Sequence, residues 1–430
     1  MALELKKIIG AIAIFISIVI GGLLLILLSL LLPEDAIHKH VVESASVFIE
    51  EGSFPHLIKD YEPSVPDNNT DAWMLLIADF HDEEMGAFEQ ALCGYYRIYV
   101  PQGTGLDGYD NIIRIQDEQA IGIRAYTRYW HGWLFFLRLL LCFLSYKGIR
   151  IFNLILMSVL LIAVAAGLWI KKQRGLIAPL CISVFIMLPN IVFMSMAYMI
   201  SFCISMVSIL VILFAGEKIK NSIGMPVFFM VIGMVTAYSE FLQFPIITLG
   251  LPLIVYLYIG DKEKEGVTER VKMALLFSVM WAVGYFGMWM SKWIVATALT
   301  RHDIIADAVS QIKIRTSGTK DPLMSEKMSR WAAIVGCFGR MNIRPFLVVL
   351  GFGLWIYFCA IAVHGFRNAK ANLINALPYL IVSLIPFAWA IVFANHTYMH
   401  SHFVYRIFIV SIFAFYAWTA EFLNDQAKKN

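Results

Sequence analysis

The chain has 430 residues, of which 60% are hydrophobic and only 15% charged, and its mean hydropathy is +0.72. Soluble domains carry about 25% charged residues, so this composition excludes an ordinary soluble protein and indicates an integral membrane protein. The net charge of +3 is too small to suggest a nucleic-acid partner. The six cysteines contain no CxxC pair, so they predict neither a disulfide framework nor a zinc site.

The first apolar run covers residues 8–32 and follows Lys6 and Lys7. It is long enough to cross about 30 Å of hydrocarbon as a helix. A signal peptide has an apolar region of roughly 7 to 15 residues and a small-residue cleavage site, and neither fits this segment. We therefore expect a retained first span with a cytoplasmic N-terminus.

Nine further apolar runs predict nine more spans. With the N-terminus inside, every turn expected in the cytoplasm carries at least two basic residues, as the positive-inside rule requires. The sequence thus predicts an all-α polytopic protein of about ten transmembrane helices with both termini cytoplasmic, give or take one hairpin within residues 131–215. The runs lie at about 150–170, 176–193, 196–215, 223–239, 246–260, 273–295, 343–364, 376–394 and 403–422.

Two larger polar segments fall on the extracytoplasmic side of this topology, so we expect any chemistry there or within the membrane. Whether the apolar stretch 131–146 crosses the membrane stays open, because it fits either an interfacial helix or an extension of the second span. The predicted units are the first span (1–32), a first outer loop with amphipathic helices (33–130), an interfacial helix and the central spans (131–299), a second outer loop (300–342), and the last three spans with a cytoplasmic tail (343–430).

The first outer loop contains the strongest acid candidate. Asp71 follows Asn69 and Thr70, which favour a helix N-terminus, and it precedes an apolar helical pattern. The helix dipole favours an acid in this first turn, so Asp71 is equally consistent with a purely structural residue. Asp79, further along the same helix, is a second catalytic candidate.

Cations and aromatic rings gather where the first outer loop returns to the membrane, at Arg128, Tyr129, Trp130 and His131. An aromatic belt at the membrane surface accounts for the rings without a function. The cations could also bind a lipid phosphate, and the rings could stack on a sugar. In the second outer loop, residues 303–312, with Asp307, predict a helix suited to line a cleft.

Three histidines and an arginine gather before the last span. His396 and His400 are four residues apart and could share a helix face. No acidic ligand lies nearby in the sequence, so we predict no cofactor and leave a divalent metal open. Arg406 lies within the outer end of the span, where a charge usually faces a polar cavity or reaches back to the interface. Glu240, between two spans, is a further candidate at the outer surface.

The sequence also resembles a known family. The motifs NTDAWML (69–75), YTRYWHG (126–132), FLQFP (241–245) and NHTYMHSHFVYR (395–406), with the long first outer loop, resemble the membrane glycosyltransferases of the GT-C superfold. They also resemble poorly characterised bacterial polytopic proteins found with surface-polysaccharide genes. The resemblance implies a bacterial plasma membrane, an extracytoplasmic active site, a polyprenyl-phosphate-linked sugar as donor, and an acid of the first outer loop that acts on the acceptor.

We therefore expect a glycosyltransferase that moves a sugar from a polyprenyl-phosphate donor to an extracytoplasmic or lipid-linked glycan acceptor, with membrane lipid as a further partner. Asp71, or Asp79, would be the general base. The donor phosphate would be bound by Arg128, His131, His400 and Arg406, and the substrate would be contacted by Tyr129, Trp130, Glu240 and His396. A transporter or flippase of a lipid-linked saccharide and a glycan polymerase or ligase are the alternatives. The clustering of charges at the outer edge favours an enzyme over a transporter.

Overall fold

The computed structural model describes residues 2–101, 106–116, 119–222, 224–260, 265–320, 326–341, 343–364 and 373–427. Within these ranges the chain is almost entirely helical, with one two-stranded antiparallel sheet in which Tyr95 pairs with Ala125 and Ile98 with Gly122. The predicted all-α membrane class is confirmed.

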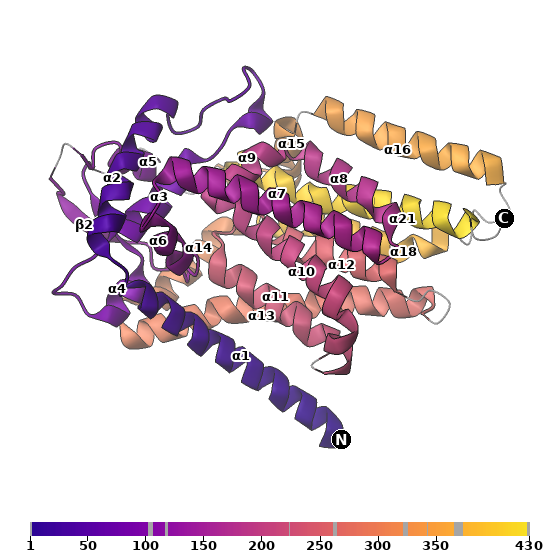
Figure 1. Cartoon of the computed structure of the whole chain (residues 1–430), viewed down its shortest axis with the longest axis horizontal. Helices are drawn as coiled ribbons and strands as arrows, with labels where there is room; N and C mark the ends of the chain where they lie inside the picture. The colour runs from indigo at the N-terminus through magenta and orange to yellow at the C-terminus, as the bar shows by residue number, and fades with distance from the viewer. Residues whose placement is uncertain are drawn as a thin grey trace.

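Residues 33–130 fold into short elements that gather at one end of a helical bundle (Figure 1). Pro33 precedes the first of these helices, and glycines 52, 86 and 94 flank the next elements, so turn residues separate the segments. The elements are α2 (Glu34–Glu51), η1 (Glu62–Ser64), α3 (Asn68–Asp79), α4 (Ala87–Cys93), β1 (Tyr95–Ile98), α5 (Asp107–Ile112), β2 (Gly122–Ala125) and, after them, α6 (Leu134–Leu141).

Long apolar helices form the bundle itself. The first half comprises α1 (Ala2–Ser29), α7 (Tyr146–Ile170), η2 (Arg174–Leu176), α8 (Ile177–Ile186), α9 (Pro189–Met194), α10 (Met196–Asn221), α11 (Met225–Ser239), α12 (Ile246–Ile259) and α13 (Val267–Leu299). The second half comprises α14 (Ile304–Arg315), α15 (Arg330–Arg340), α16 (Ile343–His364), α18 (Leu377–Val392), α19 (Ala394–Met399), α20 (Ser401–Val404), η4 (Tyr405–Phe408) and α21 (Ile409–Ala427).

Five segments of the described chain are long and apolar enough to cross a membrane, namely α1, α7, α10, α13 and residues 401–423. Four shorter apolar segments, Arg174–Ile186, α11, α12 and α18, coincide with further predicted spans. The helices therefore support the membrane class, and the predicted number of ten spans stays a prediction.

The third predicted span is interrupted in the structure. α8 ends at Ile186, Leu188 adopts a left-handed conformation with φ of 53°, and Pro189 begins α9. Proline lacks the N–H that would continue the helix, which explains the break. At 1.5 Å per residue, α8 is about 15 Å long and would cross only half of the hydrocarbon layer. Likewise, α6 ends at Leu141 and α7 begins at Tyr146, so they are two separate helices.

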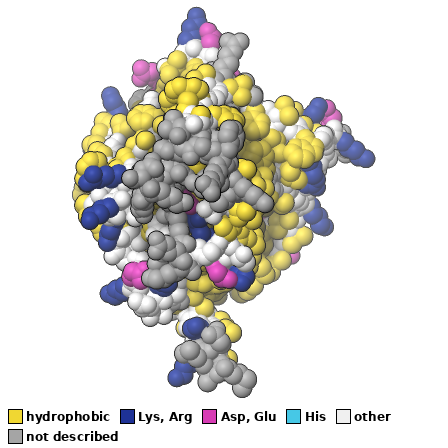
Figure 2. Space-filling view, turned by 90° about the vertical axis from the view of Figure 1, so that its right-hand side faces the viewer, with side chains coloured by type: hydrophobic (Ala, Val, Ile, Leu, Met, Phe, Trp, Pro, Cys, Tyr) yellow, Lys and Arg dark blue, Asp and Glu magenta, His cyan; other side chains and the backbone are white. Residues whose placement is uncertain are grey.

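α1 extends from residues 33–130 along the lower flank of the bundle, α16 lies on the upper flank, and α21 ends on the side away from residues 33–130 (Figure 1). Seen from this side, Lys and Arg side chains surround the edge of the face (Figure 2). Within the bundle, glycines let α11 and α13 approach closely. A Cβ on Gly284 would lie 1.9 Å from the carbonyl oxygen of Met230, and one on Gly233 would lie 2.1 Å from that of Trp281.

Candidate functional site

A cleft opens at the end of the bundle that carries residues 33–130, and we call it the rim cleft. It encloses about 440 Å³ of empty space, part of it open to solvent. Its polar lining residues include two arginines and one glutamine, and four aromatic side chains form much of its walls. The lining residues are Arg128, Tyr129, Leu242, Trp289, Trp293, Ala308, Gln311, Ile312, Arg315 and Phe393.

The helix α14 forms one wall of this cleft, which confirms the helix predicted for residues 303–312. Asp303 caps its start by accepting a hydrogen bond from the backbone N–H of Ala306 at 3.0 Å. Asp307 lies in the first turn and Arg315 in the last, where the helix dipole favours an anion and a cation respectively. These local signals therefore specify the helix and place the guanidinium of Arg315 at its C-terminal end.

The two arginines of the rim cleft differ in their partners. Arg128 forms an ion pair with Asp307 at 3.1 Å. Arg315 instead donates a hydrogen bond to Nε2 of His400 at 3.1 Å, and no carboxylate among the described residues pairs with it. Burial and the neighbouring positive charges hold the pKa of His400 well below its usual value, so the ring is neutral and accepts this bond. Arg315 thus brings an uncompensated positive charge to the cleft.

The turn between α11 and α12 supplies another part of the wall. Glu240 caps this turn, because its carboxylate accepts hydrogen bonds from the backbone N–H groups of Leu242 at 3.0 Å and Gln243 at 3.1 Å. The hydroxyl of Tyr285 donates a third bond at 3.0 Å, and burial raises the pKa of Glu240 to about 7. His396 holds the turn from the other side, with Nε2 2.7 Å from the carbonyl oxygen of Leu242. Glu240 and His396 therefore position Leu242 in the cleft.

Asp71 lies in the first turn of α3, as predicted, and is fully buried. Its Oδ1 accepts hydrogen bonds from Ser195 Oγ at 3.1 Å and the N–H of Ala197 at 3.0 Å. Its Oδ2 accepts bonds from Tyr146 Oη at 2.7 Å and the N–H of Met196 at 3.1 Å. Burial raises its pKa to about 6. Asp71 thus joins α3 and α7 to the N-terminus of α10, where the helix dipole favours its charge.

The candidates Asp79, Trp130 and His131 also make internal contacts. Asp79 accepts a hydrogen bond from Nδ1 of His38 at 2.9 Å. Nε2 of His131 lies 2.7 Å from the carbonyl oxygen of Tyr126, and burial lowers the pKa of this imidazole to about 3. Only glycine fits at position 94, which has φ of 54°, because a Cβ there would lie 2.4 Å from this Nε2. Trp130 is fully buried and donates from Nε1 to the carbonyl oxygen of Met288 at 2.8 Å.

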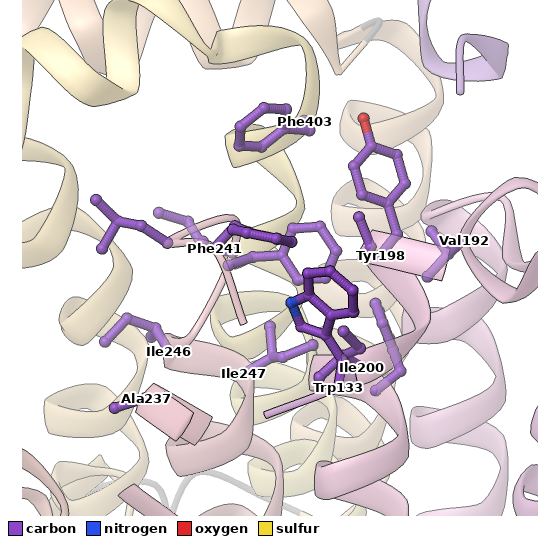
Figure 3. Packing of buried hydrophobic residues seen from close by; sticks show 14 of the residues in the cluster. Trp133, Val192, Tyr198, Ile200, Ala237, Phe241, Ile246, Ile247 and Phe403 are labelled. Atoms are coloured by element: carbon purple, nitrogen blue, oxygen red, sulfur yellow. The ribbon is translucent and has the colours of Figure 1, made fainter. Parts of the chain in front are cut away.

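Arg406 occupies a separate buried place beneath the segment 53–66. It donates to the carbonyl oxygens of Pro63 at 3.1 Å and His402 at 3.3 Å. Its guanidinium lies 4.9 Å from the ring centre of Tyr198 and 4.7 Å from that of Tyr405. The Tyr198 hydroxyl points away from the apolar packing below it (Figure 3). Within the described chain, neither residue to which Arg406 donates a hydrogen bond lines the rim cleft.

The structure thus groups seven of the ten predicted residues in three places, and Asp79, Trp130 and His131 make separate internal contacts. Arg128 and Tyr129 line the rim cleft, and Glu240, His396 and His400 hold its walls. Asp71 lies in the hydrogen-bonded junction of three helices, and Arg406 in its own pocket of aromatic rings. Sequence reasoning missed Arg315, Gln311, Trp289 and Trp293. A cation three residues beyond the predicted helix 303–312, and two tryptophans one turn apart on a predicted span, were the signals available for them.

The described residues contain no group of three or more His, Cys, Asp or Glu side chains placed to hold a metal ion. No protein-family model, no curated protein and no solved structure matches the chain. Function is therefore inferred from the side chains of the site.

Proposed function

We propose that the protein is a membrane glycosyltransferase that moves a sugar from a polyprenyl-phosphate donor to a glycan acceptor at the rim cleft. The observation that carries the proposal is Arg315, a guanidinium without a carboxylate partner among the described residues, set in a cleft with aromatic walls. A planar guanidinium suits phosphate oxygens because it can donate two parallel hydrogen bonds. The aromatic faces suit the apolar faces of a sugar ring.

Both arginines would act on the phosphate in this reaction. Transfer breaks the bond between the anomeric carbon and a phosphate oxygen, and the electron pair stays on the departing polyprenyl phosphate. Arg315 would bind this phosphate, and Arg128 would join it when phosphate replaces Asp307 as its partner. Cations that are fixed in place before the reaction stabilise such developing charge at little reorganisation cost.

The acceptor hydroxyl must lose its proton as its oxygen bonds to the anomeric carbon. Asp307 forms an ion pair with a guanidinium that lines the cleft, and release from Arg128 would free it to accept that proton. Asp71 and Asp79, the acids predicted from the sequence, stay candidates for the same role. The four hydrogen bonds to Asp71 support a structural role for it, because they occupy both of its oxygens.

The location of the cleft also supports a lipid-linked donor. Trp289 and Trp293 lie in the last turns of the apolar helix α13, and tryptophan is enriched at membrane interfaces. α14 exposes the apolar side chains of Ile305, Val309 and Ile312 beside the cleft. A polyprenyl chain in the bilayer could thus reach the cleft with its phosphate at headgroup depth. By the positive-inside rule, we place this end of the bundle on the extracytoplasmic side.

The experiment is an assay of purified protein in lipid nanodiscs with a panel of polyprenyl-phosphate sugars as donors and a panel of glycans as acceptors, measuring the release of polyprenyl phosphate. We expect protein-dependent release that falls at least tenfold in Arg315→Gln. Lys313→Gln is the matched control, because Lys313 is an exposed cation on the same helix. Equal release by Arg315→Gln and the wild-type protein would refute the proposal.

A further inference from the structure

Four buried polar groups around Arg406 have no hydrogen-bond partner among the described residues. They are the hydroxyl of Tyr198, the hydroxyl of Tyr405, Nε of Arg406 and Nε2 of His402. Tyr198, Tyr405 and Arg406 are each almost fully buried, with 0%, 1% and 0% of their surface exposed. Buried polar groups almost always have a partner, so four unpartnered groups around one guanidinium require an explanation.

These groups share one chemical character. Two hydroxyls and the guanidinium N–H are hydrogen-bond donors, and Nε2 of His402 is a donor in one of its neutral tautomers. Arg406 links these groups, since its guanidinium lies against both tyrosine rings and donates to the backbone carbonyl of His402. Several donors around one positive charge suit an acceptor with several oxygens and a negative charge.

The nearby acid does not satisfy these donors. Asp67 lies within electrostatic range of Arg406, but its Oδ1 accepts from the N–H of Thr70 at 2.9 Å and its Oδ2 from the Thr70 hydroxyl at 2.6 Å. Asp67 thus caps α3, and within the described chain no hydrogen bond joins it to Arg406. Among the described residues, Nε of Arg406 has no partner, and the other two nitrogens of its guanidinium donate to two backbone carbonyl oxygens.

We propose that Arg406, Tyr198, Tyr405 and His402 form a second oxyanion site, distinct from the rim cleft, that binds a phosphate group. A phosphate offers several acceptor oxygens to the four donors and a negative charge to the guanidinium. The two sites are neighbours. His402 lies beside Arg406, and its ring centre is 6.1 Å from that of His400, which accepts a hydrogen bond from Arg315.

The segment 53–66 covers this site and must move to admit a ligand. Pro63 contributes a carbonyl oxygen to Arg406, and the ring of Phe54 lies 5.4 Å from that of His402. Residues 56–60 are exposed, and an exposed ion pair between Glu62 and Arg340 fastens the segment to α15. Exposed ion pairs stabilise a fold only weakly, so the cover is held weakly at this point.

Resting on the proposed function, the second site would hold the phosphate of an acceptor that is itself lipid-linked, beside the donor phosphate in the rim cleft. The reaction would then join two lipid-bound substrates. Phosphate binding at the second site does not depend on sugar transfer. A binding experiment can therefore contradict the second site while the transfer assay supports the proposed function, and the reverse.

The test is equilibrium binding of radiolabelled inorganic phosphate, and of a short-chain isoprenyl monophosphate, to the purified full-length protein in nanodiscs. We expect two classes of phosphate site in the wild-type protein. Arg406→Gln should weaken binding at the second site at least tenfold, and Arg315→Gln should weaken binding at the rim cleft by a similar factor. If the site serves a lipid, the isoprenyl phosphate should bind it at least tenfold more tightly than inorganic phosphate; if it serves free phosphate, the two should bind alike.

Because Arg406 is buried, its substitution could prevent folding, so Tyr198→Phe and Tyr405→Phe provide a milder test. Each removes only a hydroxyl and should weaken phosphate binding at the second site about threefold or more, with binding at the rim cleft unchanged. Tyr238→Phe is the control, since that hydroxyl already donates to the carbonyl oxygen of Gly22 at 2.7 Å. Unchanged binding in both tyrosine variants, or complete loss of phosphate binding in Arg315→Gln alone, would show that water rather than phosphate occupies these donors.

Discussion

Arg315 donates a hydrogen bond to Nε2 of His400 at 3.1 Å, so a neutral imidazole, rather than a carboxylate, holds this guanidinium in the rim cleft. The charge of Arg315 is thus oriented without being neutralised. This arrangement suits a transient anion better than a permanent ion pair does, because an anion that binds Arg315 does not have to break a salt bridge of that residue.

His400→Ala should therefore weaken donor binding without removing the charge of Arg315. Without its acceptor, the guanidinium loses a fixed orientation, and we expect about a three- to tenfold rise in the KM for the polyprenyl-phosphate sugar. Steady-state kinetics in nanodiscs measure this effect. Tyr398→Phe, a change on the adjacent helix α19, is the control. A KM equal to that of the wild-type protein would show that His400 does not orient Arg315.

Substitution of Asp71 separates its structural role from catalysis. Asp71→Asn replaces one carboxylate oxygen with an amide N–H₂ that faces donors from Tyr146 and Met196 or from Ser195 and Ala197. Hydrogen bonds to charged groups contribute about 1.5–3 kcal/mol each, so we expect a clear fall in the apparent melting temperature. Asp79→Asn should change it less, because the partner of Asp79, His38, is 57% exposed. A fully stable but inactive Asp71→Asn protein would instead identify Asp71 as the base.

The protonation of Glu240 makes stability depend on pH. Burial raises its pKa to about 7 in the folded protein, from 4.5 for an ordinary glutamate. The folded state therefore binds more protons between these values, and this contribution to the free energy of unfolding is complete below pH 4.5 and lost as pH rises through 7. Each unit of pKa shift corresponds to about 1.4 kcal/mol.

Glu240→Gln removes this titration, so its melting temperature should fall less steeply than that of the wild-type protein between pH 5 and 7. Thermal melts at several pH values measure the difference, in which the titration of all other groups cancels. The exposed residue Glu83 provides the control variant Glu83→Gln. Parallel wild-type and Glu240→Gln profiles would mean that Glu240 is ionised throughout this range.

The orientation in the membrane can be tested by labelling. We expect a cysteine introduced at Glu83, in the 33–130 region, to react with a membrane-impermeant maleimide in intact cells. A cysteine introduced at Lys172, just beyond the C-terminal end of α7, should react only after permeabilisation. The chain with its native cysteines gives the background. The reverse pattern would place the rim cleft in the cytoplasm.

The residues also show how far sequence reasoning reaches. The first-turn position of Asp71 and the outer helix α14 follow from local signals, namely capping residues and periodicity, and both are found in the structure. The partners of Asp71 do not follow, because Tyr146 and Ser195 are 75 and 124 residues away in the chain. The Arg315–His400 contact joins residues 85 apart. Long-range pairing of this kind depends on helix packing, which periodicity alone does not specify.

The break at Leu188 illustrates the same limit at the level of the fold. Hydropathy alone supports one continuous span over 176–193, because it does not register the conformation of single residues. The left-handed Leu188 and the following proline divide that segment into two short helices.

The most direct test of the central claim follows the donor lipid itself. Wild-type protein and the Arg315→Gln variant, in sealed vesicles with glycan acceptors, would receive a polyprenyl-phosphate sugar that is radiolabelled in its lipid part. The label would be recovered as intact donor, as free polyprenyl phosphate or as donor moved to the other leaflet. We predict polyprenyl phosphate with the wild-type protein and at least tenfold less with Arg315→Gln. Intact donor that has only crossed the bilayer would contradict the account and identify a transporter.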